Sequence, residues 1–347
     1  MQPINRGSLS LRQIAGGFTG SVGVFGDYML DEYVLGSVTR ISPESPVPVV
    51  EYRNRFSTLG GAGNVVMNIK SLGGVPLPFG VVGNDMVGGT IKGKLEDEAQ
   101  LSAQYIFVDP SRPTTVKTRI VAQHQQLLRL DSESKAPVAQ ELSAKMIASV
   151  RWELPGIGAL VVSDYDKGVV NRAVFKELLT ACEDANIPVI LDPKAFDLSG
   201  IGPVTVITPN EKEAEKFSGY RVDNDRGAEA AGRRLLEQTG ARNILITRGE
   251  QGMSLFSEGG WLVHMPTQSK EVYDVTGAGD TVVATLSLAM AAGCNIADAA
   301  HVANVAAGIV VGKAGTATVT LEELDSALSG NWPRVATGRV GSRAYSG

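Results

Sequence analysis

Short apolar segments alternate with longer segments of helical periodicity through most of this 347-residue chain. The apolar segments are nearly continuous in hydrophobic residues, as expected for strands that are buried on both faces. Because this alternation builds parallel sheets with crossover helices, the sequence predicts an α/β fold of three layers, α/β/α, with a mostly parallel central sheet. Strands are expected at 22–25, 78–82, 159–163, 189–191, 204–207 and 243–247, and helices at 61–72, 85–99, 139–150, 172–185, 211–217, 226–238, 281–292 and 296–311.

Two segments depart from this alternation, at about 33–58 and 112–130. Both mix β-branched with polar residues, and the first contains Pro43, Pro46 and Pro48. Because proline is tolerated at sheet edges and turns, these segments predict a small β-sheet lid outside the main sheet. Exposed edge strands can pair with a second copy, so a homodimer through the lid is expected.

Composition limits the class of protein. We expect an N-terminal extension at 1–21, one domain at 22–330 and a disordered tail at 331–347, which is rich in Gly, Ser and Arg. The net charge of −5 and the absence of a basic stripe argue against a nucleic-acid partner. No apolar run is long enough to cross a membrane, and no secretory signal is present. The two cysteines, Cys182 and Cys294, lie in helix-like segments and are interpreted as reduced packing residues of a cytoplasmic protein.

The segment 274–280, Asp-Val-Thr-Gly-Ala-Gly-Asp, precedes a strong helix pattern that starts at Thr281. A helix that begins on glycines presents backbone N–H groups, which favour an anion such as a phosphoryl group. Asp280 in the first turn could then take a proton from an attacking hydroxyl, as in a phosphotransferase. The alternative is a tight turn with an aspartate favoured by the helix dipole.

Other polar residues follow the predicted strands, where ligands of parallel sheets bind. Gly60-Gly61-Ala62-Gly63-Asn64 would let a sugar approach the backbone, or would be an ordinary helix start with Asn64 in solvent. Asn210 and Glu213 have the spacing of a capping box, or could organise water and Mg²⁺ near phosphates. Lys194 is a phosphate ligand or a surface cation, and Thr247-Arg248-Gly249 is a turn that could flank a nucleotide.

One motif match and one possible metal site are rejected. Gly88 to Lys94 fits G-x-x-x-x-G-K, but Leu95 stands where a P-loop needs Ser or Thr, and the segment is helix-like. His124, His264 and His301 are scattered without metal-ligand spacing.

Taken in order, Gly-Gly-Ala-Gly-Asn, Asn-x-x-Glu and Gly-Ala-Gly-Asp resemble the motifs of the ribokinase-like (PfkB) carbohydrate kinases over roughly residues 22–328. Within that family, the segments 26–31, 40–49, 163–168 and 274–280 resemble the bacterial heptose 7-phosphate kinases of ADP-heptose synthesis. The resemblance implies ATP-dependent phosphorylation of D-glycero-β-D-manno-heptose 7-phosphate at O1, with Mg²⁺ and, as a further candidate cofactor, a monovalent cation. The chain has no His-x-Gly-His of a fused nucleotidyltransferase domain, so a stand-alone kinase is expected.

The resemblance also implies residue roles. Asp280 would be the base, and Gly277, Ala278 and Gly279 would form the anion hole. Asn210 and Glu213 would serve Mg·ATP, with Glu213 acting on the metal through water. The nucleotide would also meet Arg248, Gly249, Asn304 and Gly308, and the sugar would meet Asp27, Asp31, Gly61 and Asn64. From charge and placement we add Arg40, Arg119, Lys167 and Lys194 as candidate cations for the substrate phosphate.

Two alternatives stay open at this point. The chain could be a kinase of another sugar, sugar phosphate or nucleoside, because a neutral substrate needs no cationic pocket. It could also be a catalytically silent sugar- or nucleotide-binding regulator, since a fold does not fix a function. The presence of Asp280 beside a predicted anion hole argues against a silent binder.

Overall fold

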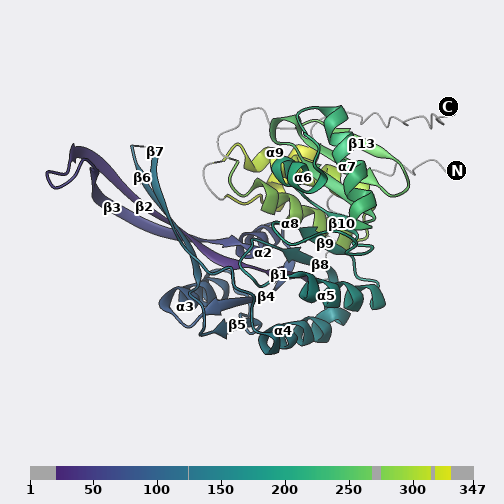
Figure 1. Ribbon diagram of the computed structural model, residues 1–347, viewed down its shortest axis with the longest axis horizontal. Coiled ribbons are helices and arrows are strands. Elements are labelled where there is room, and N and C mark those ends of the chain that lie inside the picture. Colours follow the sequence, from purple (N-terminus) through teal and green to yellow (C-terminus); the bar gives the residue numbers. More distant parts are fainter. Residues whose placement is uncertain (1–20, 124, 268–274, 314–316, 330–347) are drawn as a thin grey trace.

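A computed structural model describes residues 21–123, 125–267, 275–313 and 317–329. Its centre is a nine-stranded sheet of order β13-β12-β11-β10-β9-β8-β1-β4-β5 (Figure 1). The strands from β5 to β11 pair in parallel, and only β12 and β13 pair antiparallel. The predicted, mostly parallel sheet is therefore confirmed. The strands are β1 (Ser21–Gly26), β4 (Val75–Gly83), β5 (Ile106–Asp109), β8 (Ile157–Ser163), β9 (Val189–Asp192), β10 (Val206–Ile207), β11 (Asn243–Thr247), β12 (Met253–Ser257) and β13 (Leu262–Met265).

Helices cover both faces of this sheet, as successive residues of one strand show. Val161 of β8 belongs to one hydrophobic cluster and Val162 to the other, because neighbouring side chains of a strand point to opposite faces. The cluster around Val161 is completed by α2 (Ala62–Ser71), α3 (Met86–Gly93), α8 (Ala278–Ala291), α9 (Ile296–Val310) and α10 (Leu321–Ser329). The cluster around Val162 is completed by α4 (Gln140–Glu153), α5 (Arg172–Asp184), α6 (Glu211–Ser218) and α7 (Asp225–Thr239).

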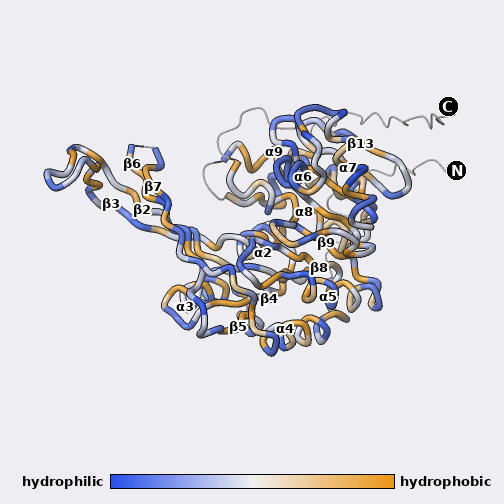
Figure 2. The backbone as a smooth tube through the Cα atoms, in the orientation of Figure 1, coloured by the Kyte–Doolittle hydropathy of each residue, from blue (hydrophilic) through white to orange (hydrophobic). Residues whose placement is uncertain are grey.

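The predicted lid is a separate four-stranded sheet of order β3-β2-β6-β7 that reaches away from the body (Figure 1). Its strands are β2 (Tyr28–Ile41), β3 (Pro48–Gly61), β6 (Thr115–Ala122) and β7 (Gln125–Ser132). The sheet begins earlier than the predicted 33–58, because β2 follows β1 after the single residue Asp27. Hydrophobic residues recur along the extended lid strands (Figure 2), and several are exposed, among them Tyr52, Phe56, Leu128 and Leu130.

Several local expectations were wrong. The helix expected at 85–99 is α3 followed by a π-helical turn at Lys94–Glu98. Because Gly88 lies inside α3, the structure agrees with the rejection of a P-loop at this segment. Sequence reasoning missed β5, β12, β13 and α10, which are short and weakly periodic. Cys294 lies between α8 and α9 rather than in a helix, whereas Cys182 is buried in α5.

Some expectations fall outside the described residues: the extension before residue 21, the first residue of the segment 274–280, and the tail. The domain boundaries therefore stay predictions. Across the described ranges, none of the helices combines the length and the apolar character that a membrane crossing requires.

Candidate active site

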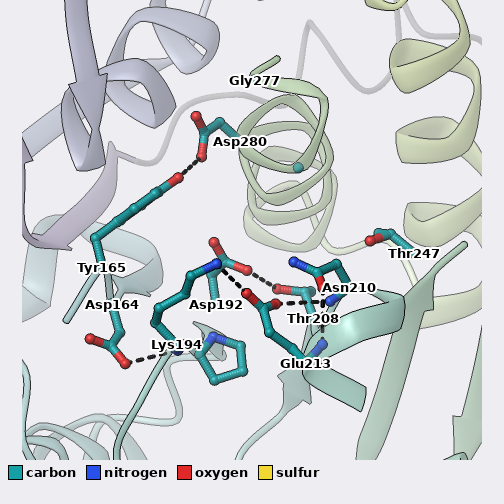
Figure 3. Close-up of a pocket in the computed structure, with 12 residues that line it drawn as sticks. Asp164, Tyr165, Asp192, Lys194, Thr208, Asn210, Glu213, Thr247, Gly277 and Asp280 are labelled. Carbon is teal, nitrogen blue, oxygen red and sulfur yellow. Dashed lines mark hydrogen bonds and ion pairs between the residues drawn. The ribbon is translucent and has the colours of Figure 1, made fainter. Parts of the chain in front are cut away.

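A pocket of about 130 Å³ opens where the carboxyl ends of β8, β9 and β11 meet the first turn of α8. Figure 3 shows two groups of side chains in it, one around Asp280 and one around Glu213. Ligands of parallel sheets bind at this edge, so the fold and the polar residues agree on the place. The lining residues are Asp164, Tyr165, Asp192, Pro193, Lys194, Thr208, Asn210, Glu213, Thr247, Gly277, Gly279 and Asp280.

Asp280 is held by donors from two distant parts of the chain. Its Oδ1 accepts a hydrogen bond from the Tyr165 hydroxyl at 2.5 Å, and its Oδ2 accepts one from the Asn64 amide at 2.6 Å. Asn64 is buried at the start of α2, so the interpretation that it points to solvent was wrong. Both contacts fix the carboxylate at the edge of the pocket in the geometry that a proton acceptor needs.

The surroundings shift the pKa of this carboxylate toward neutral pH. The pKa of Asp280 is raised from 3.8 to about 6, chiefly by burial; the hydrogen bonds from Tyr165 and Asn64 oppose this rise, and the charge on Asp31 adds to it. Burial and the charge of Asp280 raise the pKa of Tyr165 well above 10, so Tyr165 stays a donor. A carboxylate with a pKa near 6 is ionised at neutral pH and still accepts a proton readily.

The first turn of α8 faces the pocket without a side-chain cap. Gly277 precedes the helix with a φ of 82°, a conformation that favours glycine. Gly279 is exposed, and a Cβ built on it would meet no atom within 4 Å. Packing within the protein therefore does not require glycine at 279. The open space beside it could instead be occupied by a ligand. Ala278 does not line the pocket, and its N–H donates to the Val275 carbonyl at 3.3 Å.

The other group of side chains is built on α6 and the end of β9. Asn210 and Glu213 form the predicted capping box, with both hydrogen bonds at 3.0 Å. The remaining Glu213 oxygen, Oε1, accepts from Lys194 Nζ at 2.5 Å, so Lys194 is not a free surface cation. Asp192 lies beside this pair (Figure 3), and burial together with the charges of Glu213 and Asp280 raises its pKa well above 3.8.

Asp192 and Glu213 are two carboxylates that line the same side of this pocket (Figure 3). Within the described part of the chain, no three His, Cys, Asp or Glu side chains form a complete metal site. Mg²⁺ commonly binds through one or two carboxylates together with waters and substrate phosphates, and this pair suits that mode.

On the sugar side of the predicted site, Asp27 holds a loop. Its Oδ2 accepts from the backbone N–H of Tyr165 at 2.7 Å and of Lys167 at 3.2 Å, and its Oδ1 accepts from Val169 at 3.3 Å. Burial raises the pKa of Asp27 to about 6 against these hydrogen bonds. In this structure Asp27 therefore positions the residue that contacts Asp280, and a direct contact with a sugar stays a prediction.

Asp31 is also engaged. Its Oδ1 accepts from Arg119 at 2.5 Å, and the Arg119 guanidinium lies over the ring of Tyr33. Two glycines permit the close approach of β3 at this point. A Cβ at Gly60 would overlap the Asp31 carboxylate, and Gly61 has a φ of 58° with the Asp27 carbonyl beside it.

The predicted residues outside the lining of this pocket include Arg248, Gly249, Asn304, Gly308 and Arg40. The Arg248 guanidinium is buried in contacts with Asp225 at 2.7 Å and Ser254 at 3.0 Å, which support the turn after β11. The amide of Asn304 in α9 donates to the Pro266 carbonyl at 2.8 Å. Arg40 is exposed near the far end of β2. Gly249 and Gly308 are likewise absent from the lining, so nucleotide or phosphate contacts of Arg248, Gly249, Asn304, Gly308 and Arg40 stay predictions.

Sequence reasoning gave no role to Tyr165, Asp192 or Thr208, which all line the pocket. Thr208 Oγ1 donates to Asp192 Oδ1 at 3.2 Å. The available signal was position, because each residue lies at or just after the end of a strand of the parallel sheet.

The pfkB family carbohydrate kinase model matches residues 22–324 of this chain. The chain belongs to the pfkB family of carbohydrate kinases. It is 45% identical over 303 residues to the bifunctional protein HldE of Paramagnetospirillum magneticum, which covers 87% of this chain and 62% of that relative. The chain thus spans about three-fifths of the length of this relative.

Solved structures show the same fold. Arabidopsis thaliana ribokinase in complex with ribose and ATP superposes with a TM-score of 0.71 at 19% identity, over 90% of this chain and 100% of that one. Escherichia coli phosphofructokinase-2 in complex with fructose-6-phosphate gives 0.72 at 16% identity, over 90% and 98%. Kinases of the pfkB family use ATP and Mg²⁺.

Proposed function

We propose that this pfkB kinase phosphorylates D-glycero-β-D-manno-heptose 7-phosphate at O1 to give the 1,7-bisphosphate, in the synthesis of ADP-heptose. The observation that carries the proposal is the 45% identity to a bifunctional HldE protein over 87% of this chain. The segments 26–31, 40–49 and 163–168, which resemble heptose 7-phosphate kinases, support the same substrate. The geometry around Asp280 supports the reaction type, which is phosphoryl transfer to a hydroxyl.

In this mechanism Asp280 receives the proton of the sugar O1 hydroxyl as O1 bonds to the γ-phosphorus. The bond from that phosphorus to the β,γ-bridging oxygen breaks, and ADP leaves. The first-turn amides of α8, at Gly279 and Asp280, lie where charge develops on the transferring group, and such donors supply much of the rate in phosphoryl transfer. Asn64 and Tyr165 keep the carboxylate oriented by their hydrogen bonds of 2.6 and 2.5 Å.

Mg²⁺ would neutralise the phosphate charge of ATP when bound. Asp192 and Glu213 would hold it, directly or through water, and Lys194 would lie against the same phosphates by exchanging its 2.5 Å bond to Glu213 for a bond to a phosphate oxygen. Escherichia coli phosphofructokinase-2, which shares this fold, has been solved with potassium, so a monovalent cation near the nucleotide is part of the proposal. As an enzyme that consumes ATP, the protein would act in the cytoplasm.

The proposal extends to a homodimer through the lid. The lid carries exposed apolar side chains, including Tyr52 at 67% and Leu130 at 53% exposure, and two copies that pair through these strands would cover them. Sedimentation at micromolar concentration tests this point, and a monomer would contradict it.

The function is tested by measuring ADP release with Mg·ATP and a panel of acceptors: the heptose 7-phosphate, fructose 6-phosphate, ribose, fructose and adenosine. Turnover confined to the heptose 7-phosphate, with the product phosphorylated at O1, is the expected result. Turnover confined to a neutral sugar or nucleoside would keep the role of Asp280 and overturn the proposed substrate.

A further inference from the structure

Three of the predicted phosphate-binding cations are paired with carboxylates in the folded chain. Arg119 is bound to Asp31 at 2.5 Å, and Lys194 is bound to Glu213 at 2.5 Å on the nucleotide side of the pocket. Lys167 is bound to Glu133 at 3.0 Å and lies on the sugar side, in the loop that follows β8. If the acceptor sugar carries a phosphate, its binding site should therefore lie near Lys167.

A second lysine, Lys117 of β6, lies on the face of the lid that looks toward the base. In the pairing of β2 with β6, Lys117 is directly opposite Asp31, and side chains at paired positions project from the same face of a sheet. Asp31 lies against Gly60 at the end of β3, and Asn64, four residues later, donates to Asp280 at 2.6 Å, so this face of the lid lies beside the first turn of α8. Lys117 is half-buried there.

Lys117 and Lys167 influence each other electrostatically. Burial and the positive charge of Lys167 lower the pKa of Lys117, while Asp131 and Glu133 oppose that change. Asp131 is bound to Arg129 at 2.8 Å, and Glu133 is bound to Lys167 at 3.0 Å. Among the residues that the structure describes, the Lys117 ammonium has neither a hydrogen bond nor an ion pair. Two neighbouring ammonium groups in a partly desolvated place are unfavourable unless an anion lies between them.

One loop sets the distance from this lysine pair to the base. Tyr165 contacts Asp280 at 2.5 Å, and Lys167 follows two residues later. Asp27 accepts hydrogen bonds from the backbone N–H of both residues, at 2.7 and 3.2 Å, so the two side chains start from fixed positions. A substrate whose hydroxyl reaches Asp280 and which extends along this loop would bring its opposite end to the lysines.

We propose that Lys117 and Lys167 together bind the phosphate of the acceptor sugar, and that Lys117 makes the kinase select a phosphorylated sugar over a neutral one. A phosphate dianion can accept hydrogen bonds from both ammonium groups, and it would give Lys117 the partner that the folded chain does not provide. The inference rests on the proposed function, because it needs a substrate that carries a phosphate.

The test compares Lys117→Met with the wild-type chain on heptose 7-phosphate and on the same heptose without phosphate. We expect the KM for the heptose 7-phosphate to rise about 10- to 100-fold, in line with the loss of a charged hydrogen bond. The KM for Mg·ATP and the slow turnover of the neutral heptose should stay within about twofold. Lys117→Arg, which keeps the charge, should retain the KM within a few-fold.

Lys135→Met is the matched control. Lys135 is 62% exposed and pairs with Asp166 at 2.5 Å, so its removal changes the charge by the same amount near the same loop. Its KM for heptose 7-phosphate should stay unchanged. An equal rise in this control, or no rise in Lys117→Met, would overturn the inference while the wild-type activity leaves the proposed function standing. A wild-type enzyme that uses only the neutral heptose would overturn both.

Discussion

Two helices, α6 and α8, begin at the same pocket, but their first turns are completed in different ways. In α6 the Asn210 side chain accepts from the Glu213 N–H and Glu213 accepts from the Asn210 N–H, each at 3.0 Å. In α8 the residue before the helix is Gly277, which provides no side-chain cap. A helix start closed by its own side chains needs no ligand, whereas an open one can bind an anion.

The comparison separates two motifs that look equally functional in the sequence. Under the proposed function, the backbone at α8 would bind the transferring group and Asp280 would accept the proton. At α6 the backbone is already satisfied, so under the proposed function only Glu213 Oε1, which accepts from Lys194, and the neighbouring Asp192 would serve the nucleotide and its metal. The proposed function thus places a backbone site for the transferring group and a side-chain site for the cation in the same pocket.

The largest expected effect comes from removing the base at the open helix. Asp280→Asn should lose at least about 10²-fold in kcat, as general-base contributions indicate, and should bind ATP normally. Folding should not suffer. Because burial raises the folded-state pKa to about 6, the ionised carboxylate costs stability above that pH, and asparagine removes the cost. Single-turnover kinetics and thermal melting at pH 8 measure both quantities, and turnover within tenfold of wild type would remove Asp280 from the mechanism.

A smaller loss of kcat is expected when a methyl group fills the open space beside Gly279, in the first turn of α8. Gly279→Ala adds a methyl group that meets no protein atom within 4 Å, so the melting temperature should not fall. The methyl would occupy the space of the transferring group, and a misplacement of about 1 Å can cost about 10²-fold in rate. Lys212→Ala, at the equivalent second position of α6, is the control and should leave kcat unchanged. Unchanged kcat in both variants would mean that the α8 turn is only structural.

Much of the fold was predictable because it depends on local patterns. The strand 243–247 was predicted with its observed bounds, and α5 and α9 were predicted to within one residue, since long periodic segments bury one face and end at turn residues. The pair β12–β13 was missed, because short strands on the antiparallel edge of the sheet carry little periodic signal.

The site was less predictable, because its contacts join distant segments. Asn64 and Asp280 are 216 residues apart, and no sequence pattern announces that they touch. The role of Asp27 as the holder of a loop depends on three backbone N–H groups whose positions follow only from the folded chain. A motif could therefore nominate these residues, but it could not distinguish a group that meets the ligand from one that positions it.

At the capped start of α6 we expect a substitution to reduce stability rather than catalytic activity. Asn210→Ala removes the side-chain acceptor of the α6 capping box, which should lower the free energy of unfolding by about 1 kcal/mol. The effect on kcat should be small, because Glu213 keeps its contact with Lys194. Denaturant unfolding followed with steady-state kinetics measures the two, and a large loss of kcat without a loss of stability would make Asn210 a ligand rather than a cap.

The smallest effect is expected from Tyr165→Phe, and it should depend on pH. In the wild type, kcat should fall as the pH drops through about 6, because protonated Asp280 cannot accept the O1 proton. The Tyr165 hydrogen bond lowers the pKa of Asp280, so its removal should move this acid limb to higher pH. At pH 8 the carboxylate is ionised in both enzymes, and kcat should change only a few-fold. A pH profile of kcat with an unshifted acid limb would show that Tyr165 does not act on the base. A shifted acid limb with an unchanged KM would mean that Tyr165 sets the pKa of Asp280 without contacting either substrate.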